Sequence, residues 1–297
     1  MNETIISWAT HTLNWVHGCS KPAAVPPDML ELAESVSGPI DVRWTKPNTS
    51  PECARCYAEA LSNKRGWTPK PWIEANEVDN VQFHPERFKD IAKLPVKSVH
   101  LPPSQRNRIF ICSMGDLFHR LVPDDLLRRL FKEMEATPHI YQLLTKRPER
   151  AMEWPGPWPE NVWLGTTCGH TVTKWRIECL RRSKAKVRFV SAEPLVTSLM
   201  PLNLEGIHQV IVGGESGGGY RPIDMAWARE IRDACVANNT AFFMKQDAAF
   251  RTETRCYLVE KDGSCFQWMQ FPGELRPPVM VPPDNQKYHK EHFRILA

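Results

Sequence analysis

Short apolar runs alternate with longer amphipathic stretches over residues 108–247. The apolar runs lie within 108–116, 140–148, 161–168, 187–195, 209–217 and 241–247. Short, nearly continuous apolar runs indicate parallel β-strands that are buried on both faces. The amphipathic stretches, which repeat apolar residues at helical spacing, are 123–137, 172–183 and 224–239. The pattern predicts an α/β fold built from strand–helix units.

A right-handed series of such units forms either an open doubly wound sheet or a barrel. Ser, Thr, Gly or a charged residue follows strand after strand in this chain. A barrel collects the carboxyl ends of all its strands at one active site. We therefore predict a full or partial (β/α) barrel of parallel strands over residues 1–247.

Two segments depart from this pattern. Residues 20–52 mix a short helical pattern with proline-rich flanks and are predicted to form an insertion near the N-terminus. The segment 248–297 is rich in proline, and we expect it to be an irregular C-terminal covering segment.

Composition and charge narrow the function only slightly. Apolar residues make up 42% of the 297 residues, and there is neither a long apolar span nor a basic leader, so we expect no membrane partner. The net charge of +4 permits a nucleic-acid partner without requiring one. The basic segment 181–188 is either a solvated helix end or a nucleic-acid contact, and Trp67, Trp175 and Trp227 have basic neighbours and would stack on bases if exposed.

The nine cysteines indicate metal binding or reactivity in a chain with no sign of export. Cys53 and Cys56 have a two-residue gap that lets two thiolates reach one metal centre, and Cys19 precedes them. With His11 or His17 as a fourth ligand, these residues would form a structural Cys₃His zinc site. Three other cysteines lie in apolar or helical patterns and are expected to be small buried residues, namely Cys112, Cys179 and Cys235.

A combination of motifs over about residues 5–247 suggests a family. The motifs are "GCS", "SPECARCYAEAL", "FICSMGDLFH", "LLTKRPER", "GTT", "SAEPL", "GGESG", "RPID" and "FFMKQ". Together they resemble the radical S-adenosylmethionine (SAM) superfamily, and more closely its phage-associated three-cysteine-motif branch. This resemblance implies a radical-SAM-like barrel.

The resemblance also implies a cofactor set. Cys19, Cys53 and Cys56 would hold a [4Fe–4S] cluster and leave the fourth iron open for S-adenosylmethionine. The 33 residues between Cys19 and Cys53 are a departure from the superfamily spacing, so the insertion 20–52 must loop out.

Residues after the first two predicted strands are candidates for cofactor and substrate binding. The resemblance places Ser113 and Asp116 near the methionine amino group, although Asp116 would equally cap a helix. Lys146 is a candidate for the cofactor carboxylate and Arg147 for a substrate phosphate, against the alternative of an ordinary surface pair.

The later strand ends supply the remaining candidates. Glu193 is predicted to contact the cofactor ribose or the substrate, because a buried acid without a partner is costly. Glu193 and Lys245 are the candidate catalytic residues, although Lys245 would equally serve as a structural partner of Glu193 or Glu215. Lys245, Gln246 and Glu215 are candidate substrate contacts. Glu215 and the two glycines before it, Gly213 and Gly214, form a candidate cofactor-binding loop.

These residues favour an enzyme that uses a 5′-deoxyadenosyl radical and an external reducing electron donor. The expected substrate is DNA or a modified nucleotide, and the expected reaction is isomerisation of an amino-acyl (glycinyl) thymidine during hypermodification of phage DNA. The alternatives are a radical lyase that repairs a damaged base, and a non-enzymatic nucleic-acid-binding protein with a Cys₃His zinc site. The expected location is the cytoplasm, that of the host if the protein is phage-encoded.

Overall fold

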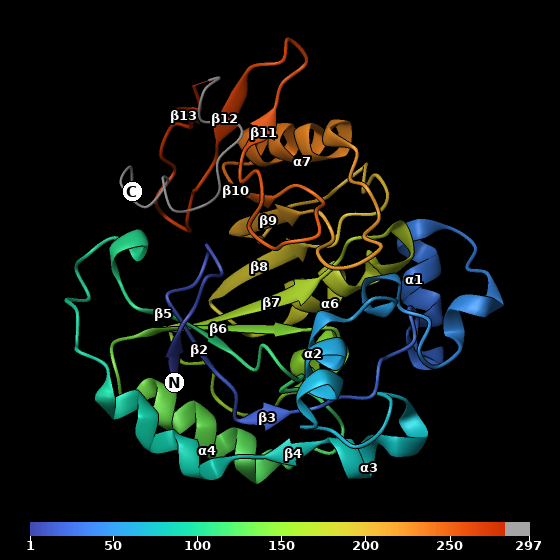
Figure 1. Cartoon of the computed structure of the whole chain (residues 1–297), viewed down its shortest axis with the longest axis vertical. Coiled ribbons are helices and arrows are strands. Elements are labelled where there is room, and N and C mark those ends of the chain that lie inside the picture. Colours follow the sequence, from blue (N-terminus) through green and yellow to red (C-terminus); the bar gives the residue numbers. More distant parts are fainter. Residues whose placement is uncertain (283–297) are drawn as a thin grey trace.

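A curled, mostly parallel sheet of eight strands forms a half-barrel in the computed structural model, which describes residues 1–282 (Figure 1). Its strands lie side by side in the order β1 (Asn2–Glu3), β2 (His11–Leu13), β5 (Arg108–Ile111), β6 (Ile140–Thr145), β7 (Val162–Thr167), β8 (Val187–Ala192), β9 (Gln209–Gly213) and β10 (Ala241–Gln246). All neighbours pair in parallel except β1, which runs antiparallel to β2 at the edge. The predicted partial barrel is confirmed at this level.

Helices cover the outer face of the sheet. They are α4 (Asp124–Glu135), α5 (Pro148–Glu153), α6 (Trp175–Arg182) and α7 (Met225–Ala237), and the three predicted amphipathic stretches contain α4, α6 and α7. Helix α4 shows why: Pro123 precedes its acidic first turn, and Leu127, Leu130 and Phe131 bury one stripe against the sheet. A 3₁₀ turn, η7 (Thr171–Thr173), leads into α6.

The two faces of the sheet bury different residues, because successive side chains of a strand point to opposite sides. Ile109, Ile111 and Leu143 point to the helices. The concave face is filled mainly by aromatic and β-branched residues, which are Trp8, Phe110, Ile140, Trp163, Phe189, Ile211, Phe243 and Phe271. The half-barrel therefore has a packed interior near the amino ends of its strands.

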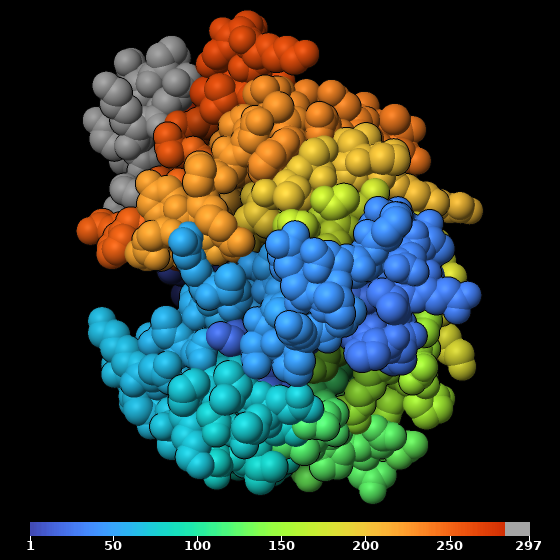
Figure 2. All heavy atoms as spheres, turned by 90° about the vertical axis from the view of Figure 1, so that its right-hand side faces the viewer, coloured from blue at the N-terminus to red at the C-terminus, as the bar shows by residue number. Residues whose placement is uncertain are grey.

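The insertion packs on the outside of α6. It contains η1 (Pro27–Met29), α1 (Leu30–Ser37) and η2 (Val42–Thr45), and Ala33 of α1 is buried with Val172 and Trp175. Further short elements precede β5: η3 (Pro51–Cys53), α2 (Tyr57–Arg65), η4 (Glu74–Asn76), α3 (Glu77–Asn80), η5 (Pro85–Lys93) and η6 (Pro103–Gln105), with β3 (Val16–His17) paired to β4 (Gln82–Phe83). The blue segments, which contain α1 and α2, cover the carboxyl ends of the central strands (Figures 1 and 2).

The C-terminal segment is more regular than its composition predicts. It forms a three-stranded antiparallel sheet of β11 (Leu258–Val259), β12 (Cys265–Gln267) and β13 (Val279–Met280). Residues 268–271 then run beside β10, where Trp268 O accepts from Met244 N and Gln270 N donates to Phe242 O. The part of the predicted covering segment from 283 onward lies outside the described residues.

No helix among residues 1–282 is long and apolar enough to cross a membrane.

Candidate functional site

Cys19 lies next to the loop that follows β5. The Gly18 N–H donates to Met114 O at 2.9 Å, and Gly18 pairs with Gly115. Gly18 has φ +80°, and a Cβ there would come within 2.0 Å of Asn80 O, so only glycine fits. This turn places Cys19 beyond the carboxyl end of the sheet's first parallel strands.

Cys53 ends η3 and Cys56 caps the start of α2, and the residue before Cys53 anchors this segment. The Glu52 carboxylate accepts hydrogen bonds from Gly169 N at 2.9 Å and Thr173 Oγ1 at 2.6 Å. Its other oxygen accepts from Ser50 Oγ at 2.8 Å and pairs with Arg176, which is fully buried. The network ties the cysteine segment to the loop after β7.

Sequence reasoning missed both members of this ion pair. Burial opposes ionisation of Glu52, but Arg176 and the hydrogen bonds outweigh it and hold the pKa of Glu52 below its ordinary value. The position of Glu52 directly before Cys53 could have indicated that Glu52 belongs to the site. For Arg176, helical periodicity gives no such indication.

The three thiols lie in one neighbourhood. Cys19 and Cys56 belong to a small apolar cluster with Trp72 and Met114. Burial, with smaller contributions from Cys56 and Cys19, raises the pKa of the Cys53 thiol to about 12. Within residues 1–282, no group of three His, Cys, Asp or Glu side chains is arranged as a formed metal site.

Lys146 is a buried cation that acts electrostatically on both Cys53 and Cys56. Burial opposes its charge, but Cys53, Cys56 and Glu52 together raise the pKa of Lys146 above its ordinary value. The Lys146 backbone N–H donates to Asp116, whereas no hydrogen bond or ion pair of its ammonium group occurs among the described residues. The ammonium group is therefore a counter-charge available to thiolates.

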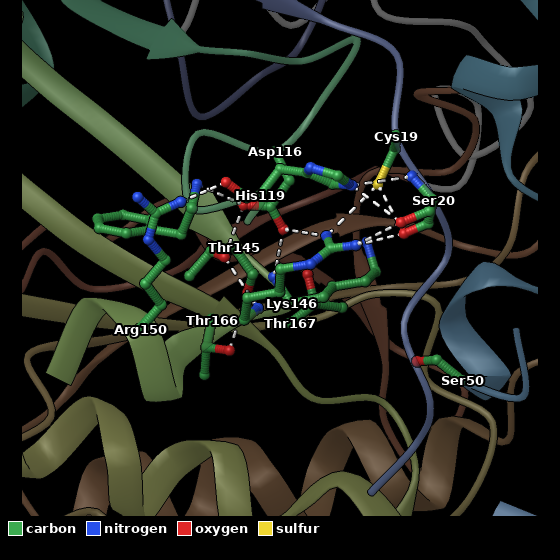
Figure 3. A network of polar contacts seen from close by, with 12 residues as sticks. Cys19, Ser20, Ser50, Asp116, His119, Thr145, Lys146, Arg150, Thr166 and Thr167 are labelled. Carbon is green, nitrogen blue, oxygen red and sulfur yellow. Dashed lines mark hydrogen bonds and ion pairs between the residues drawn. The ribbon is translucent and has the colours of Figure 1, made fainter. Parts of the chain in front are cut away.

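Arg147 and Asp116 hold Cys19 (Figure 3). Arg147 Nη1 lies 3.4 Å from Cys19 Sγ and 3.3 Å from Asp116 Oδ2, and Arg147 Nη2 donates to Ser20 O. Asp116 also accepts from Thr145 Oγ1 at 2.7 Å. Burial raises the pKa of the Cys19 thiol, and the Arg147 guanidinium partly opposes this rise.

These contacts describe what the candidate residues do without a ligand. Both carboxylate oxygens of Asp116 are used to join the loops after β5 and β6, so Asp116 is a junction and not a helix cap. Ser113 accepts a hydrogen bond on its carbonyl from Tyr57 Oη at 2.6 Å, and its hydroxyl donates to Asn14 Oδ1.

A second buried network, which sequence reasoning also missed, supports Ser20 (Figure 3). His119 Nε2 lies 2.9 Å from Ser20 Oγ, and Ser20 Oγ donates to Glu77 at 2.9 Å. Burial lowers the pKa of His119 to about 4, so the ring is neutral at pH 7. The single histidine in "DLFH" carried no sequence signal for this position.

Glu193 and Lys245 form an ion pair at the carboxyl end of the interior. Lys245 is buried and points inward with Phe243, two residues before it on β10. Cys56 and Glu193 both act electrostatically on the Tyr57 hydroxyl, which places this pair near the cysteines. The structural partner considered for Lys245 is thus Glu193.

Glu215 and Gln246 bind other parts of the protein. Glu215 pairs with Arg221 at 2.6 Å and with Arg55 at 3.3 Å. Gln246 is fully buried, and its amide donates to Gly214 O and accepts from Glu253 N. A Cβ at Gly214 would meet Ala248 N at 2.2 Å, and one at Gly213 would meet the Glu193 side chain at 3.2 Å.

The two candidate histidines make their contacts with residues other than the three thiols. His17 Nε2 lies 3.1 Å from Ser62 Oγ, and its ring meets Trp67 edge-on. His11 begins β2, opposite Ile109 at the start of β5. Neither contact involves a cysteine.

The predicted nucleic-acid contacts are unevenly placed. Segment 181–188 ends α6 and begins β8, so it lies at the amino ends of the strands. Trp175 is fully buried and Trp227 packs against the core, whereas Trp67 is exposed at the end of α2. Cys112, Cys179 and Cys235 are buried, as predicted.

Comparison with known proteins identifies a family without an activity. The model of the family DUF5131, described as a protein of unknown function, matches residues 45–287, which include Cys53 and Cys56 but not Cys19. No curated protein and no solved structure matches the chain, and the family match is not to a radical SAM family. Because the match covers most of the 297 residues, the chain belongs to the DUF5131 family, whose function is unknown.

Proposed function

We propose that this protein is a radical SAM enzyme that rearranges a modified base in DNA. The observation that carries the proposal is the meeting of Cys19, Cys53 and Cys56 at the carboxyl end of the half-barrel, beside two cations. The motif resemblance supplies the cofactor class and the substrate class. The half-barrel is compatible with that resemblance.

The donor set fits a [4Fe–4S] cluster with one open iron. Three free cysteines are the candidate ligands, and thiolates are the usual ligands of such clusters. With S-adenosylmethionine bound, the cluster would supply a 5′-deoxyadenosyl radical that abstracts hydrogen from an unactivated carbon. Because burial keeps Cys53 protonated, with a pKa of about 12, loading must release its proton.

The surrounding residues would prepare and shield this site. Lys146 and Arg147 stabilise negative charge on the sulfur atoms, since an opposite charge nearby favours the ionised form. The Glu193–Lys245 pair presents a fixed donor and acceptor toward the substrate. The segments that contain α1 and α2 limit the access of water to the strand ends.

The reaction that we propose is isomerisation of a glycinyl-modified thymine in phage DNA. The methylene carbon on the thymine ring would break its bond to the glycine nitrogen and form a bond to the glycine α-carbon, and one α-hydrogen would move to the nitrogen. The product contains the same atoms as the substrate, so no oxidant is consumed. An external one-electron donor would be needed to generate the radical.

The test is anaerobic reconstitution, followed by iron and sulfide analysis and electron paramagnetic resonance with and without S-adenosylmethionine. We expect a cubane signal that the cofactor perturbs. Cys53→Ala and Cys56→Ala should each lose most of the iron, whereas Cys235→Ala, which removes a buried thiol on α7, should retain it. Zinc without sulfide, or equal iron in all three variants, would overturn the proposal.

Product analysis then tests the reaction class. Modified DNA is incubated with the reduced enzyme and digested to nucleosides for mass spectrometry. Rearranged nucleoside of unchanged mass supports the isomerase, and cleaved product would assign the enzyme to the lyases.

A further inference from the structure

We infer that an exposed surface beside the thiols binds a single-stranded segment of DNA. This surface, called the rim surface below, consists of Arg55, Tyr220, Arg221, Phe250 and Arg251. The inference rests on the proposed function for the choice of DNA as substrate. It adds where the strand is held and in which form.

Hydrogen bonds bring three separate loops together to form the rim surface. The Glu215 carboxylate accepts hydrogen bonds from Arg55, which lies in the cysteine segment, and from Arg221, which lies in the loop after β9. Arg221 Nη2 donates to Pro51 O at 2.9 Å. Ala249 N donates to Glu215 O at 3.1 Å, which brings in the loop after β10. In Figure 2 the orange loop after β10 lies against the blue α2 segment.

Two aromatic side chains of the rim surface project into solvent. Phe250 is 71% exposed and Tyr220 is 41% exposed. Exposed aromatic side chains in single-strand binding proteins stack on successive bases, because every nucleobase has a flat face that packs on an aromatic ring. Tyr220 follows a run of glycines in which Gly217 and Gly219 have positive φ, so the loop lets a strand approach its backbone closely.

The rim surface carries a positive excess. Two guanidinium groups, those of Arg55 and Arg221, pair with one buried carboxylate, Glu215. Arg251 is exposed, and no ion pair of its side chain occurs among residues 1–282. The nearby Arg255 is neutralised by Asp247 at 2.7 Å. Such an excess attracts the phosphate backbone.

The position of the rim surface connects it to the chemistry. Arg55 directly precedes Cys56, and Tyr57, which is 52% exposed, follows it. A base projecting from a strand on the rim surface would therefore reach the thiols and Glu193. A base inside a duplex is closed to chemistry until it leaves the stack, so an unpaired strand is the form that fits.

The basic segment 181–188, the other candidate for a nucleic-acid contact, has arginine side chains that hydrogen-bond to backbone carbonyls of the protein itself. Arg181 bonds to Asn203 O and Glu205 O, and Arg188 bonds to Gly206 O. These contacts fix both side chains at the end of the sheet away from the cysteines. Phosphate binding there would not present a base to the site.

The test measures the binding of a fluorescein-labelled, single-stranded DNA of 15 nucleotides to the whole chain. Binding is followed by fluorescence anisotropy at low and moderate salt concentrations. Phe250→Ala and Tyr220→Ala should each weaken binding roughly 5- to 150-fold, which corresponds to about 1–3 kcal/mol per stacked base. Arg251→Ala should weaken binding and reduce its salt dependence. Phe83→Ala and Lys184→Ala, at exposed positions outside the rim surface, are the matched controls and should bind like the wild type.

Several outcomes would overturn the inference. These are wild-type affinity in Phe250→Ala and Tyr220→Ala, an equal loss in the control variants, or tighter binding of a duplex with the same sequence. Iron content is measured on the same samples. If the protein holds no iron but still binds DNA through the rim surface, the proposed function is refuted and the inference about the rim surface is retained. If Phe250→Ala loses binding and keeps its full iron content, both the proposed function and the inference are supported.

Discussion

Glu52 is a charged residue whose partners all lie inside the protein. Its side chain is fully buried, and so is that of Arg176, its ion-pair partner 124 positions along the chain. Burying two charges removes their hydration, which only close pairing and further hydrogen bonds offset. Because Glu52 precedes Cys53, this pair fixes the position of a proposed cluster ligand.

Glu52→Gln should destabilise the protein by roughly 3–5 kcal/mol, since the change leaves the buried Arg176 charge without its counter-charge. The free energy of unfolding is measured in urea at pH 7. Glu160→Gln, which alters an 88% exposed carboxylate, is the control and should change stability by less than about 0.5 kcal/mol. A loss below 1 kcal/mol for Glu52→Gln would mean that the ion pair does not anchor the cysteine segment.

Strands and helices were predicted well where local patterns decide them. Runs of apolar residues mark β5 to β10, and the amphipathic repeat marks α4 and α7. The segment between β3 and β5 was not predicted in the same detail, because distant contacts hold it. The bond from Glu52 to Gly169 and the close approach of Gly18 to Asn80 have no periodic signature.

The candidate site was predicted in part for the same reason. Motif spacing picked out the thiols, Lys146, Glu193 and Lys245, because each follows a recognisable strand or belongs to a cysteine motif, but it left open whether Glu193 or Glu215 pairs with Lys245. It could not find Arg176 or His119, which are buried by tertiary packing alone. Nor could it show that the Gln246 amide hydrogen-bonds to the loop after β9 and to the loop after β10.

The insertion behaves as a separable element on α6. Val25 N donates to Trp44 O at 3.0 Å, so the chain leaves and returns at one place. Replacing residues 26–43 by Gly-Asn-Gly should therefore keep the fold. Because α1 no longer covers Trp175 and Val172, stability should fall by about 2–5 kcal/mol.

Circular dichroism, urea unfolding and iron content measure this deletion. We expect native secondary structure and unchanged iron content, since Cys19 and Cys53 are held by contacts outside residues 26–43. Loss of iron in a folded deletion variant would instead assign the insertion to the metal site.

At the scale of the molecule, the half-barrel has two ends with different chemistry. The amino end is closed by apolar packing: Phe271 meets Phe243 edge-on, with ring centroids 5.7 Å apart, and the Arg108 guanidinium lies 4.4 Å from the Phe271 ring centroid. The carboxyl end holds the thiols and the buried ion pairs. The C-terminal segment supplies Phe271, so residues far from the cysteines contribute to stability.

Phe271→Ala tests whether the two ends are independent, because it should lower the stability of the protein without changing the metal site. Removing a buried aromatic ring typically costs about 3–5 kcal/mol, so the midpoint of urea unfolding should fall clearly. Phe250→Ala, which truncates the same residue type at an exposed position, should leave the midpoint unchanged. Iron content and the cofactor-perturbed spectrum of Phe271→Ala should match those of the wild type below the unfolding transition. If iron were lost together with stability while the protein stayed folded, the packing at the amino end would be shown to position the thiols through the strands, and the two ends would be one cooperative unit.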